Sequence, residues 1–265
     1  MSVVIAILAK DKETTLPFYL DCIYHQTYEK KNIHLYIRTN DNRDNTAGLL
    51  KQFIEQRGAE YASVYFDDSP ISEQLKEYGN HEWNVVRFHI LGKIRQDSVE
   101  YAKQRKASYF VVDCDNFIVP ATLERLMQHN VVIAPMLKSA NAYSNYHYVV
   151  DKNGYFESHD FYYTILNGQI KGLIQVECVH CTYLIPFDYL DKVLYDDGSC
   201  RYEYVILCSE LRKHNIPQYI DNTFPYGFLT FATTPEEFEQ DVSLSLQYPF
   251  QKKHLNSYRS HSETT

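Results

Sequence analysis

Residues 107–119, ASYFVVDCDNFIV, join a short apolar segment to two closely spaced carboxylates. Residues 108–112 carry no charge and are rich in aromatic and β-branched side chains, which predicts a buried strand. Asp113 and Asp115 follow directly, and residues i and i+2 of an extended chain point to the same side. We therefore expect both carboxylates to lie together at the rim of a sheet.

Two neighbouring carboxylates repel each other, and this repulsion has to be relieved. A shared proton would relieve it, and so would a divalent metal ion, which prefers hard oxygen ligands. A buried strand, an Asp-x-Asp pair and a second apolar run, here residues 117–119, form an arrangement that holds a metal ion against a nucleotide diphosphate. The alternative is an acidic strand-to-turn junction without a ligand, since Asp and Asn are common in turns.

The composition places the chain among globular proteins and argues against one class of partner. Of the 265 residues, 45% are apolar and 23% are charged, which is enough apolar material for a core. The net charge is −8 and there is no long basic run, so we expect no nucleic-acid partner. The 24 tyrosines include rings that could stack on sugars or bases, although packing in strands explains most of them.

The N-terminal segment and the cysteines predict a location. Residues 1–9 include an apolar run, but they lack a basic region and a small-residue cleavage site and are too short for a membrane span. Six scattered cysteines argue against a dense disulfide framework. We therefore expect a cytoplasmic protein without a membrane span, although a chain trimmed of its signal peptide would look the same.

Strand-length apolar runs alternate with helical patterns up to the Asp-x-Asp pair. The predicted strands are residues 2–8, 33–38 and 62–66, and the predicted helices are residues 15–26, 47–57 and 84–106. This alternation predicts an α/β fold, in which a parallel sheet has helices on both faces. Such sheets bind ligands at the carboxyl ends of their strands.

The pattern is less regular beyond the Asp-x-Asp pair. We predict helices at 121–128 and 203–214, strands at 131–135, within 168–184 and at 217–221, and loops at 67–83 and 224–228. No internal repeat or Gly/Ser-rich linker occurs, so we expect one domain, residues 1–234. Residues 235–265 would form a loosely ordered C-terminal extension.

Several separate pieces of the sequence keep the order and spacing of a known family. They are residues 6–9 and 16–20, the strand exit 41–46, the motif 109–116, the acceptor-side residues 132–137 and 143–145, and the smaller matches 179–180 and 226–227. Over residues 4–230 the chain resembles GT-A nucleotide-sugar glycosyltransferases, and more closely the collagen galactosyltransferases of glycosyltransferase family 25. The family also occurs in large DNA viruses beside collagen-like proteins. The Tyr- and Asn-rich composition would suit such a source, with the protein associated with the virion or the host cell.

The resemblance implies a Rossmann-like GT-A fold with a mixed, mostly parallel central sheet and helices on both faces. It implies transfer of galactose or glucose from UDP-galactose or UDP-glucose to hydroxylysine of a collagen-like polypeptide. The anomeric centre would invert, which requires one base near the acceptor hydroxyl and no covalent intermediate. Asp113 and Asp115 would hold Mn2+ or Mg2+ across the diphosphate, where the ion neutralises charge on the leaving UDP.

The donor nucleotide would lie across the ends of the predicted strands. The predicted nucleotide-sugar site consists of Ala9, Lys10, Thr39, Asn40, Asp41, Lys93, Arg95, Val112, Asp113 and Cys114. Loops after the first two strands would line the uridine pocket, with Asp41 accepting from a uracil or ribose donor group. Lys93 or Arg95 would reach the diphosphate from the long helix. A solvated turn or a solvated helix face is the alternative for these residues.

The catalytic base would be a carboxylate at the start of the helix at residue 203. The related enzymes carry paired aspartates there, whereas this chain has Tyr202-Glu203-Tyr204. Glu203 is therefore the predicted base, and Asp196 and Asp197 are the alternatives. A glutamate at a helix start is also favoured by the helix dipole alone.

Other metal-ligating residue types are less informative. Cys178 and Cys181 form one Cys-x-x-Cys pair, but a zinc site needs a second pair and no correctly spaced pair follows. We expect His180 to be a hydrogen-bonded core or cleft histidine. A late histidine often completes the metal site of GT-A enzymes, and His254 and His261 are the candidates here.

Two other classes of function stay open. A GT-A fold that binds a nucleotide or a collagen-like chain without catalysis would explain the altered acid at Glu203, and turnover of a UDP-sugar separates it from an enzyme. A nucleotidyltransferase also uses paired carboxylates on an α/β sheet, but it usually has a Gly-rich, basic loop near its first strand. Residues 9–15 contain no glycine, which argues against this class.

Overall fold

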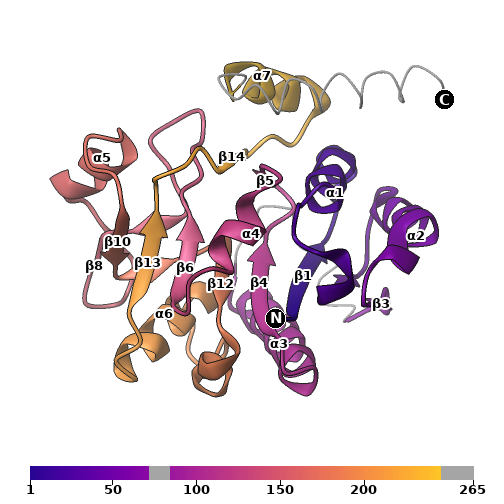
Figure 1. Cartoon of the computed structure of the whole chain (residues 1–265), viewed down its shortest axis with the longest axis horizontal. Coiled ribbons are helices and arrows are strands. Elements are labelled where there is room, and N and C mark those ends of the chain that lie inside the picture. The colour runs from indigo at the N-terminus through magenta and orange to yellow at the C-terminus, as the bar shows by residue number, and fades with distance from the viewer. Residues whose placement is uncertain (72–83, 246–265) are drawn as a thin grey trace.

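The structure is a computed structural model that describes residues 1–71 and 84–245. The strands of its central sheet are β1 (Val3–Ala9), β2 (Ile33–Thr39), β3 (Ser63–Asp67), β4 (Ser108–Val112), β6 (Val132–Pro135), β10 (Leu173–Val176), β12 (Thr182–Ile185) and β13 (Gln218–Asp221). They form one eight-stranded sheet in the order β10-β13-β6-β12-β4-β1-β2-β3 (Figure 1).

Helices and short strand pairs surround this sheet. The helices are α1 (Leu16–Tyr24), α2 (Thr46–Arg57), α3 (Val85–Gln104), α4 (Thr122–Leu126), α5 (Asp160–Leu166), α6 (Glu203–Lys213) and α7 (Pro235–Ser245). The short pairs are β5 (Asn116–Ile118) with β14 (Gly227–Leu229), β7 (Tyr146–His147) with β11 (Cys178–Val179), and β8 (Val149–Val150) with β9 (Phe156–Glu157).

The first half of the chain is a run of parallel strands joined by helices, as predicted. β1 pairs in parallel with β2, and β2 pairs in parallel with β3. α3 begins after Asn84, whose side chain accepts a hydrogen bond from Arg87 N at 3.1 Å. This helix returns the chain to the other side of β1, where β4 pairs with β1 in parallel. The carboxyl ends of β1, β2 and β4 therefore lie at one edge of the sheet.

The second half makes the sheet mixed. β12 runs antiparallel to both β4 and β6, β13 runs parallel to β6, and β10 forms an antiparallel edge. The prediction of a mixed, mostly parallel sheet is thus confirmed.

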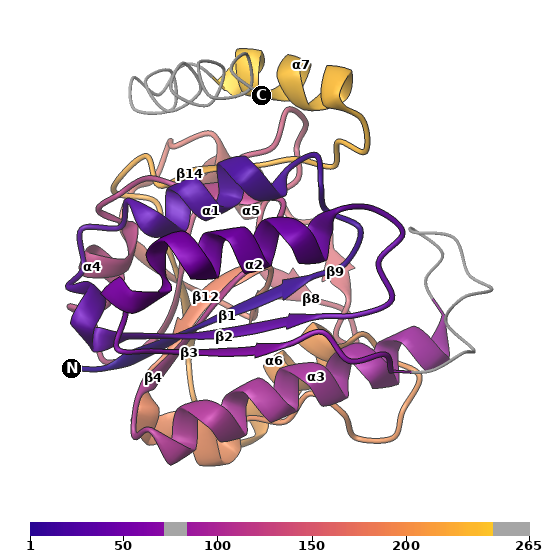
Figure 2. The same ribbon diagram turned by 90° about the vertical axis from the view of Figure 1, so that its right-hand side faces the viewer.

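Side chains alternate along the central strands, so the sheet is buried on both faces. In β1, Val3, Ile5 and Ile7 pack on one face, whereas Val4 and Ala6 pack on the other. Figure 2 shows α1, α2 and α4 over the first face and α3 and α6 over the second. Burial on both faces explains why the strand sequences are continuous apolar runs.

The β5–β14 pair lies over the exit of β4 and requires a glycine. Gly227 has a φ of +146°, and a Cβ atom there would lie 1.9 Å from Phe117 O. Only glycine fits such an approach of two main chains. We predicted a loop at 224–228, and its last two residues instead belong to β14, because they pair with β5.

α7 begins the segment that we predicted to be a loosely ordered extension. Phe238 and Val242 of this helix are buried, and the Phe238 ring centroid lies 5.3 Å from that of Phe117. These two side chains attach α7 to the core, although most of the other described side chains of the helix are exposed. Residues 246–265 lie outside the described residues, so the rest of the tail and the boundary at residue 234 stay predictions.

Within residues 1–71 and 84–245, no helix is both long and apolar enough to cross a membrane. Of the predicted loop at 67–83, residues 72–83 lie outside the described residues.

Candidate active site

The carboxyl ends of β1 and β4 meet where the order of the strands reverses. The chain runs outward from β1 through β2 to β3, and then returns to β4 on the other side of β1. Loops that leave neighbouring strands in opposite directions open a crevice, which is where open α/β sheets bind ligands. The predicted residues Val112 and Cys114 are buried there, and Cys114 Sγ donates to Leu8 O at 3.4 Å. Cys114 therefore ties the exit of β4 to β1, and neither side chain faces solvent.

Asp113 and Asp115 follow β4 and are tied to two distant segments through the main chain. Asp113 N donates to Cys181 O at 2.9 Å, and Thr230 N donates to Asp115 O at 3.0 Å. Their side chains stay 29% and 30% exposed. Burial and the charge of Asp115 together raise the pKa of Asp113, against the opposing charge of Arg95. The carboxylates therefore interact electrostatically and are open to a ligand.

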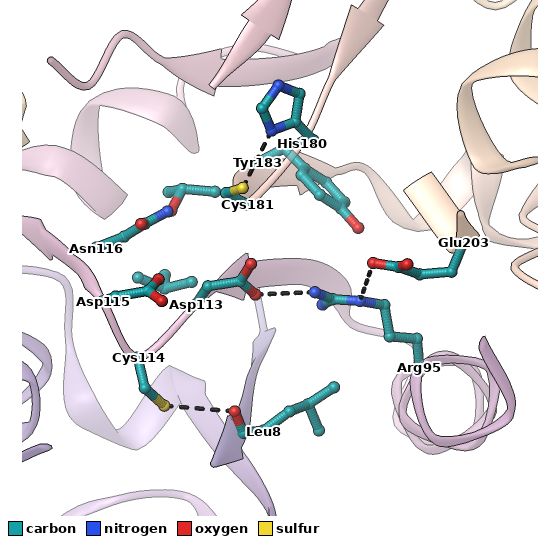
Figure 3. A network of polar contacts seen from close by, with 12 residues as sticks. Leu8, Arg95, Asp113, Cys114, Asp115, Asn116, His180, Cys181, Tyr183 and Glu203 are labelled. Carbon is teal, nitrogen blue, oxygen red and sulfur yellow. Dashed lines mark hydrogen bonds and ion pairs between the residues drawn. The ribbon is translucent and has the colours of Figure 1, made fainter. Parts of the chain in front are cut away.

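Arg95 lies between Asp113 and Glu203 (Figure 3). Arg95 Nη2 is 2.8 Å from Asp113 Oδ1, and Arg95 Nε is 3.3 Å from Glu203 Oε1. Burial lowers the pKa of Arg95, but Asp113, Glu203 and two nearby tyrosines together outweigh burial and raise it well above its usual value. We predicted that Arg95 reaches a diphosphate, and this contact stays a prediction. The arginine is only 5% exposed and two protein carboxylates engage its Nη2 and Nε, whereas its Nη1 has no hydrogen-bonding partner among the described residues.

Lys12 supplies a second cation that the sequence analysis missed. Lys12 Nζ lies 2.8 Å from Asp115 Oδ2, and Lys12 N donates to Thr46 Oγ1 at 2.7 Å. Burial lowers the pKa of Lys12, but the charge and hydrogen bond of Asp115 together with other nearby acidic groups outweigh burial and raise it. The available signal was a lysine two residues after Lys10, in the loop that leaves the first predicted strand.

The two aspartates keep oxygen lone pairs that fit a divalent cation. Asp113 Oδ2 accepts no hydrogen bond from the described residues. When the Asn116 amide is oriented to accept from Thr182 Oγ1, it donates to Asp115 Oδ1 at 3.2 Å. Carboxylates are hard ligands of the kind that Mg2+ and Mn2+ prefer, and such ions commonly complete their shell with phosphate and water.

A third protein ligand is not found among the described residues. Those ranges contain no group of three or more His, Cys, Asp or Glu side chains placed to hold a metal ion. The two predicted third ligands, His254 and His261, lie outside the described residues.

The loops after β1 and β2 meet on the β2 side of this crevice. Ala9 lies opposite Thr39 in the register of the two strands. Lys10 Nζ donates to Asn40 O at 3.3 Å and to Asp41 O at 2.8 Å, and burial lowers the pKa of Lys10. Asp41 has a φ of 45°, a strained conformation of the kind that clusters at ligand sites. The fold thus brings these five predicted residues together.

Lys93 lies on α3 and not in the loops after β1 and β2. It is exposed and lines a separate hollow of about 440 Å³ between α3 and the strands β2 and β3. Tyr36 and Tyr65 stack in the wall of this hollow with ring centroids 5.0 Å apart. The predicted diphosphate contact of Lys93 stays a prediction. Successive helical residues are about 100° apart, so Lys93 and Arg95 point to different sides of α3.

The three candidate bases differ in burial and in their hydrogen-bonding partners, and the pKa values of two of them shift in opposite directions. The Glu203 side chain is 7% exposed, and burial raises its pKa. Asp196 Oδ1 lies 2.9 Å from His89 Nδ1. Hydrogen bonds outweigh burial and lower the pKa of Asp197 to about 2, which makes it a weak base.

His180 lies beside the loop that contacts Asp113. Its Nδ1 is 3.0 Å from Cys181 Sγ, and its Nε2 is buried without a hydrogen-bonding partner among the described residues. Our expectation of a hydrogen-bonded histidine is therefore wrong for Nε2. Cys181 has a φ of 62° and presents the carbonyl oxygen that accepts from Asp113 N.

Tyr143 and Phe231 form an exposed aromatic pair near the carboxylates. Their ring centroids are 5.0 Å apart, and the residues are 36% and 57% exposed. Tyr143 OH lies 3.9 Å from Cys181 Sγ, and Phe231 follows Thr230, whose main chain bonds to Asp115. The resemblance pointed to residues 143–145, but no sequence signal pointed to Phe231, which only the fold brings to this place.

The order of the strands in the sheet, its covering helices and the acidic pair at the end of β4 define a GT-A glycosyltransferase fold. Solved structures with this fold align with most of the chain. S. aureus TarS 1–349 in complex with UDP aligns with a TM-score of 0.54 at 14% identity, over 92% of this chain and 64% of that chain. Mannosyltransferase PcManGT from Pyrobaculum calidifontis, in complex with GDP-Man and Mn2+, aligns with a TM-score of 0.55 at 9% identity, over 93% and 64%.

The sequence comparison then identifies the family. Residues 1–247 match the family model for "Glycosyltransferase family 25, N-terminal domain", and the chain belongs to glycosyltransferase family 25. The predicted family is thus confirmed, and the match gives no support to a nucleotidyltransferase.

Relatives include both enzymes and a protein named inactive. Mouse inactive glycosyltransferase 25 family member 3 is 26% identical over 89% of this chain and 42% of its own length. Human procollagen galactosyltransferase 2 is 28% identical over 91% and 40%. Procollagen galactosyltransferase 1-A of Xenopus laevis is 28% identical over 100% and 51%. The chain thus spans about half or less of the length of these relatives.

Proposed function

We propose that this chain is a glycosyltransferase domain that moves a hexose from a UDP-sugar to a hydroxyl group of a protein, with inversion at the anomeric carbon. The observation that carries the proposal is the pair Asp113 and Asp115 at the end of β4, next to β1 at the carboxyl edge of a GT-A sheet. Similarity to procollagen galactosyltransferases supports hydroxylysine of a collagen-like chain as the acceptor, and galactose or glucose as the hexose.

Each group of residues takes one task in this proposal. Asp113 and Asp115 would hold Mn2+ or Mg2+, which when bound neutralises charge on the UDP leaving group. The loops after β1 and β2 would bind the nucleotide. Arg95 acts as a positioning residue, because it holds Asp113 and Glu203 at fixed places on its two sides. The exposed Tyr143–Phe231 pair offers an apolar surface to the acceptor.

Release of UDP tests this function. The protein is incubated with UDP-galactose or UDP-glucose and a hydroxylysine-containing collagen-like peptide, first with Mn2+ and then with EDTA. We expect release from one of the two sugars with Mn2+, and a fall to background with EDTA, because the leaving diphosphate loses its counter-charge. Absence of both release and UDP binding in the presence of Mn2+ would refute the proposal.

A non-catalytic binding module is the second candidate, and two observations favour it. One of the relatives is named as an inactive family member, and Glu203 is buried against Arg95. In that case UDP would bind in a metal-dependent manner, but neither sugar would be turned over even with the acceptor peptide present.

We propose Glu203 as the base, and its pKa predicts a pH dependence. Burial raises this pKa, so Glu203 takes up a proton at a higher pH than a free glutamate, and only the unprotonated form can accept the acceptor proton. We therefore expect kcat to fall as the pH decreases through the raised pKa. Glu203→Gln should lower kcat about 100-fold and remove this acid limb.

Glu210→Gln is the matched control for Glu203→Gln, because Glu210 lies on the same helix and pairs with Lys213. The control should keep the wild-type kcat and pH profile. A Glu203→Gln variant with wild-type kcat and an unchanged acid limb would exclude Glu203 as the base, and Asp196 would be the next candidate.

A further inference from the structure

Arg95 and Lys12, the two cations at the Asp-x-Asp pair, differ in burial and in the number of carboxylates that they contact. Arg95 is 5% exposed and engages a carboxylate on each side, Asp113 and Glu203. Lys12 reaches Asp115 through Nζ alone, and these two side chains are 28% and 30% exposed. Arg95 is therefore a fixed counter-ion, whereas Lys12 lies on the open side of the site.

The main chain of Lys12 is anchored by three hydrogen bonds, whereas its side chain is held by one ion pair. Lys12 N donates to Thr46 Oγ1 at 2.7 Å, and Lys12 O accepts from Thr15 N at 3.1 Å and Leu16 N at 2.8 Å. The side chain is a flexible four-carbon stem with a point charge and three rotatable donors. Nζ can therefore change its partner without moving the loop that leaves β1.

A divalent cation and the Lys12 ammonium compete for the same carboxylate. Both are positive, and like charges held a few ångströms apart in a partly buried site repel strongly. A cation on Asp115 would therefore displace Nζ from Oδ2. A diphosphate bound by that cation would bring negative charge into the crevice where Lys12 is anchored, and lysine binds phosphate well as a point charge.

We propose that Lys12 is an exchangeable counter-ion, which neutralises Asp115 before ligands bind and passes to the diphosphate when a divalent cation takes its place. This inference rests on the proposed function, because it needs a nucleoside diphosphate in the crevice. It has a consequence that a purely structural ion pair lacks. Lys12 weakens the binding of the metal alone, yet strengthens the binding of UDP once the metal is present.

Two calorimetric titrations on the whole chain test the exchange, one with Mn2+ alone and one with UDP at saturating Mn2+. We expect Lys12→Met to bind Mn2+ about tenfold more tightly than the wild type and UDP about tenfold more weakly. Lys12→Arg keeps the charge and should stay near the wild type in both titrations. Lys103→Met is the matched control, because Lys103 also pairs with a carboxylate, Glu100 Oε1 at 2.9 Å, but lies on α3 away from the acidic pair. Both affinities of this variant should stay unchanged.

The outcomes separate this inference from the proposed function. If the wild type binds UDP with Mn2+ and Lys12→Met matches it in both titrations, the exchange is overturned and the proposed function stands. A change of both affinities in the same direction also overturns the exchange. If the wild type binds no UDP in the presence of Mn2+, the proposed function and the exchange fail together.

Discussion

Asp113→Asn and Asp115→Asn are each expected to lower the turnover of UDP-sugar by about 10³- to 10⁴-fold. Asparagine keeps the shape of aspartate but removes its charge, so it holds a divalent cation far less well. The cation would supply several kcal/mol of charge stabilisation to the leaving UDP, and each 1.4 kcal/mol is about tenfold in rate. The initial rate of UDP release with Mn2+ measures this loss.

Asp97→Asn is the matched control for these two variants. Asp97 is an exposed acid of α3 in the wall of the separate hollow, so its removal should leave the rate unchanged. Circular dichroism checks that all three variants fold. If Asp115→Asn keeps more than a tenth of the wild-type rate and an unchanged Mn2+ requirement, Asp115 is not a metal ligand.

Arg95→Met is expected to lower the free energy of unfolding by about 3–5 kcal/mol at neutral or higher pH. Methionine fills part of the volume of arginine but leaves Glu203, whose side chain is 7% exposed, without its ion-pair partner. A buried charge that loses its partner is far more costly than a surface pair that is broken. Urea unfolding measures the loss, and Lys213→Met, which breaks the exposed pair with Glu210, is the control with little expected change.

The loss of unfolding free energy in Arg95→Met should depend on pH and should become smaller as the pH falls. Burial raises the pKa of Glu203 in the folded state, so the folded state binds more protons than the unfolded state near that pKa. The contribution of this group to stability therefore increases as the pH falls. Removing Arg95 raises this pKa further, so the deficit of Arg95→Met should be smaller at mildly acidic pH than at neutral pH.

A second variant separates the charge of Glu203 from the packing of Arg95. Arg95→Met/Glu203→Gln removes the unpaired charge and should regain part of the stability lost at neutral pH. If Arg95→Met costs less than about 1 kcal/mol and shows no pH dependence, the guanidinium is not the main partner of Glu203.

Local patterns in the sequence were enough for the parallel half of the sheet and for the position of its acidic pair. An uncharged strand of aromatic and β-branched residues followed by two aspartates depends only on neighbours in the chain, and the structure has β4 at 108–112 with Asp113 and Asp115 at its end. Alternating strands and helices determined the parallel half of the sheet, because a helical crossover has few ways to return to a parallel neighbour. The order and spacing of the motifs identified the family.

Tertiary structure decided which charges meet and which residues close the site. Lys12 and Asp115 are far apart in the chain, and they form an ion pair only because β4 lies next to β1. Helical periodicity left open which face of α3 is buried, and packing against the sheet and α6 turned Arg95 inward between two carboxylates while Lys93 stayed exposed. Such contacts depend on strand order and helix rotation, which no local pattern contains.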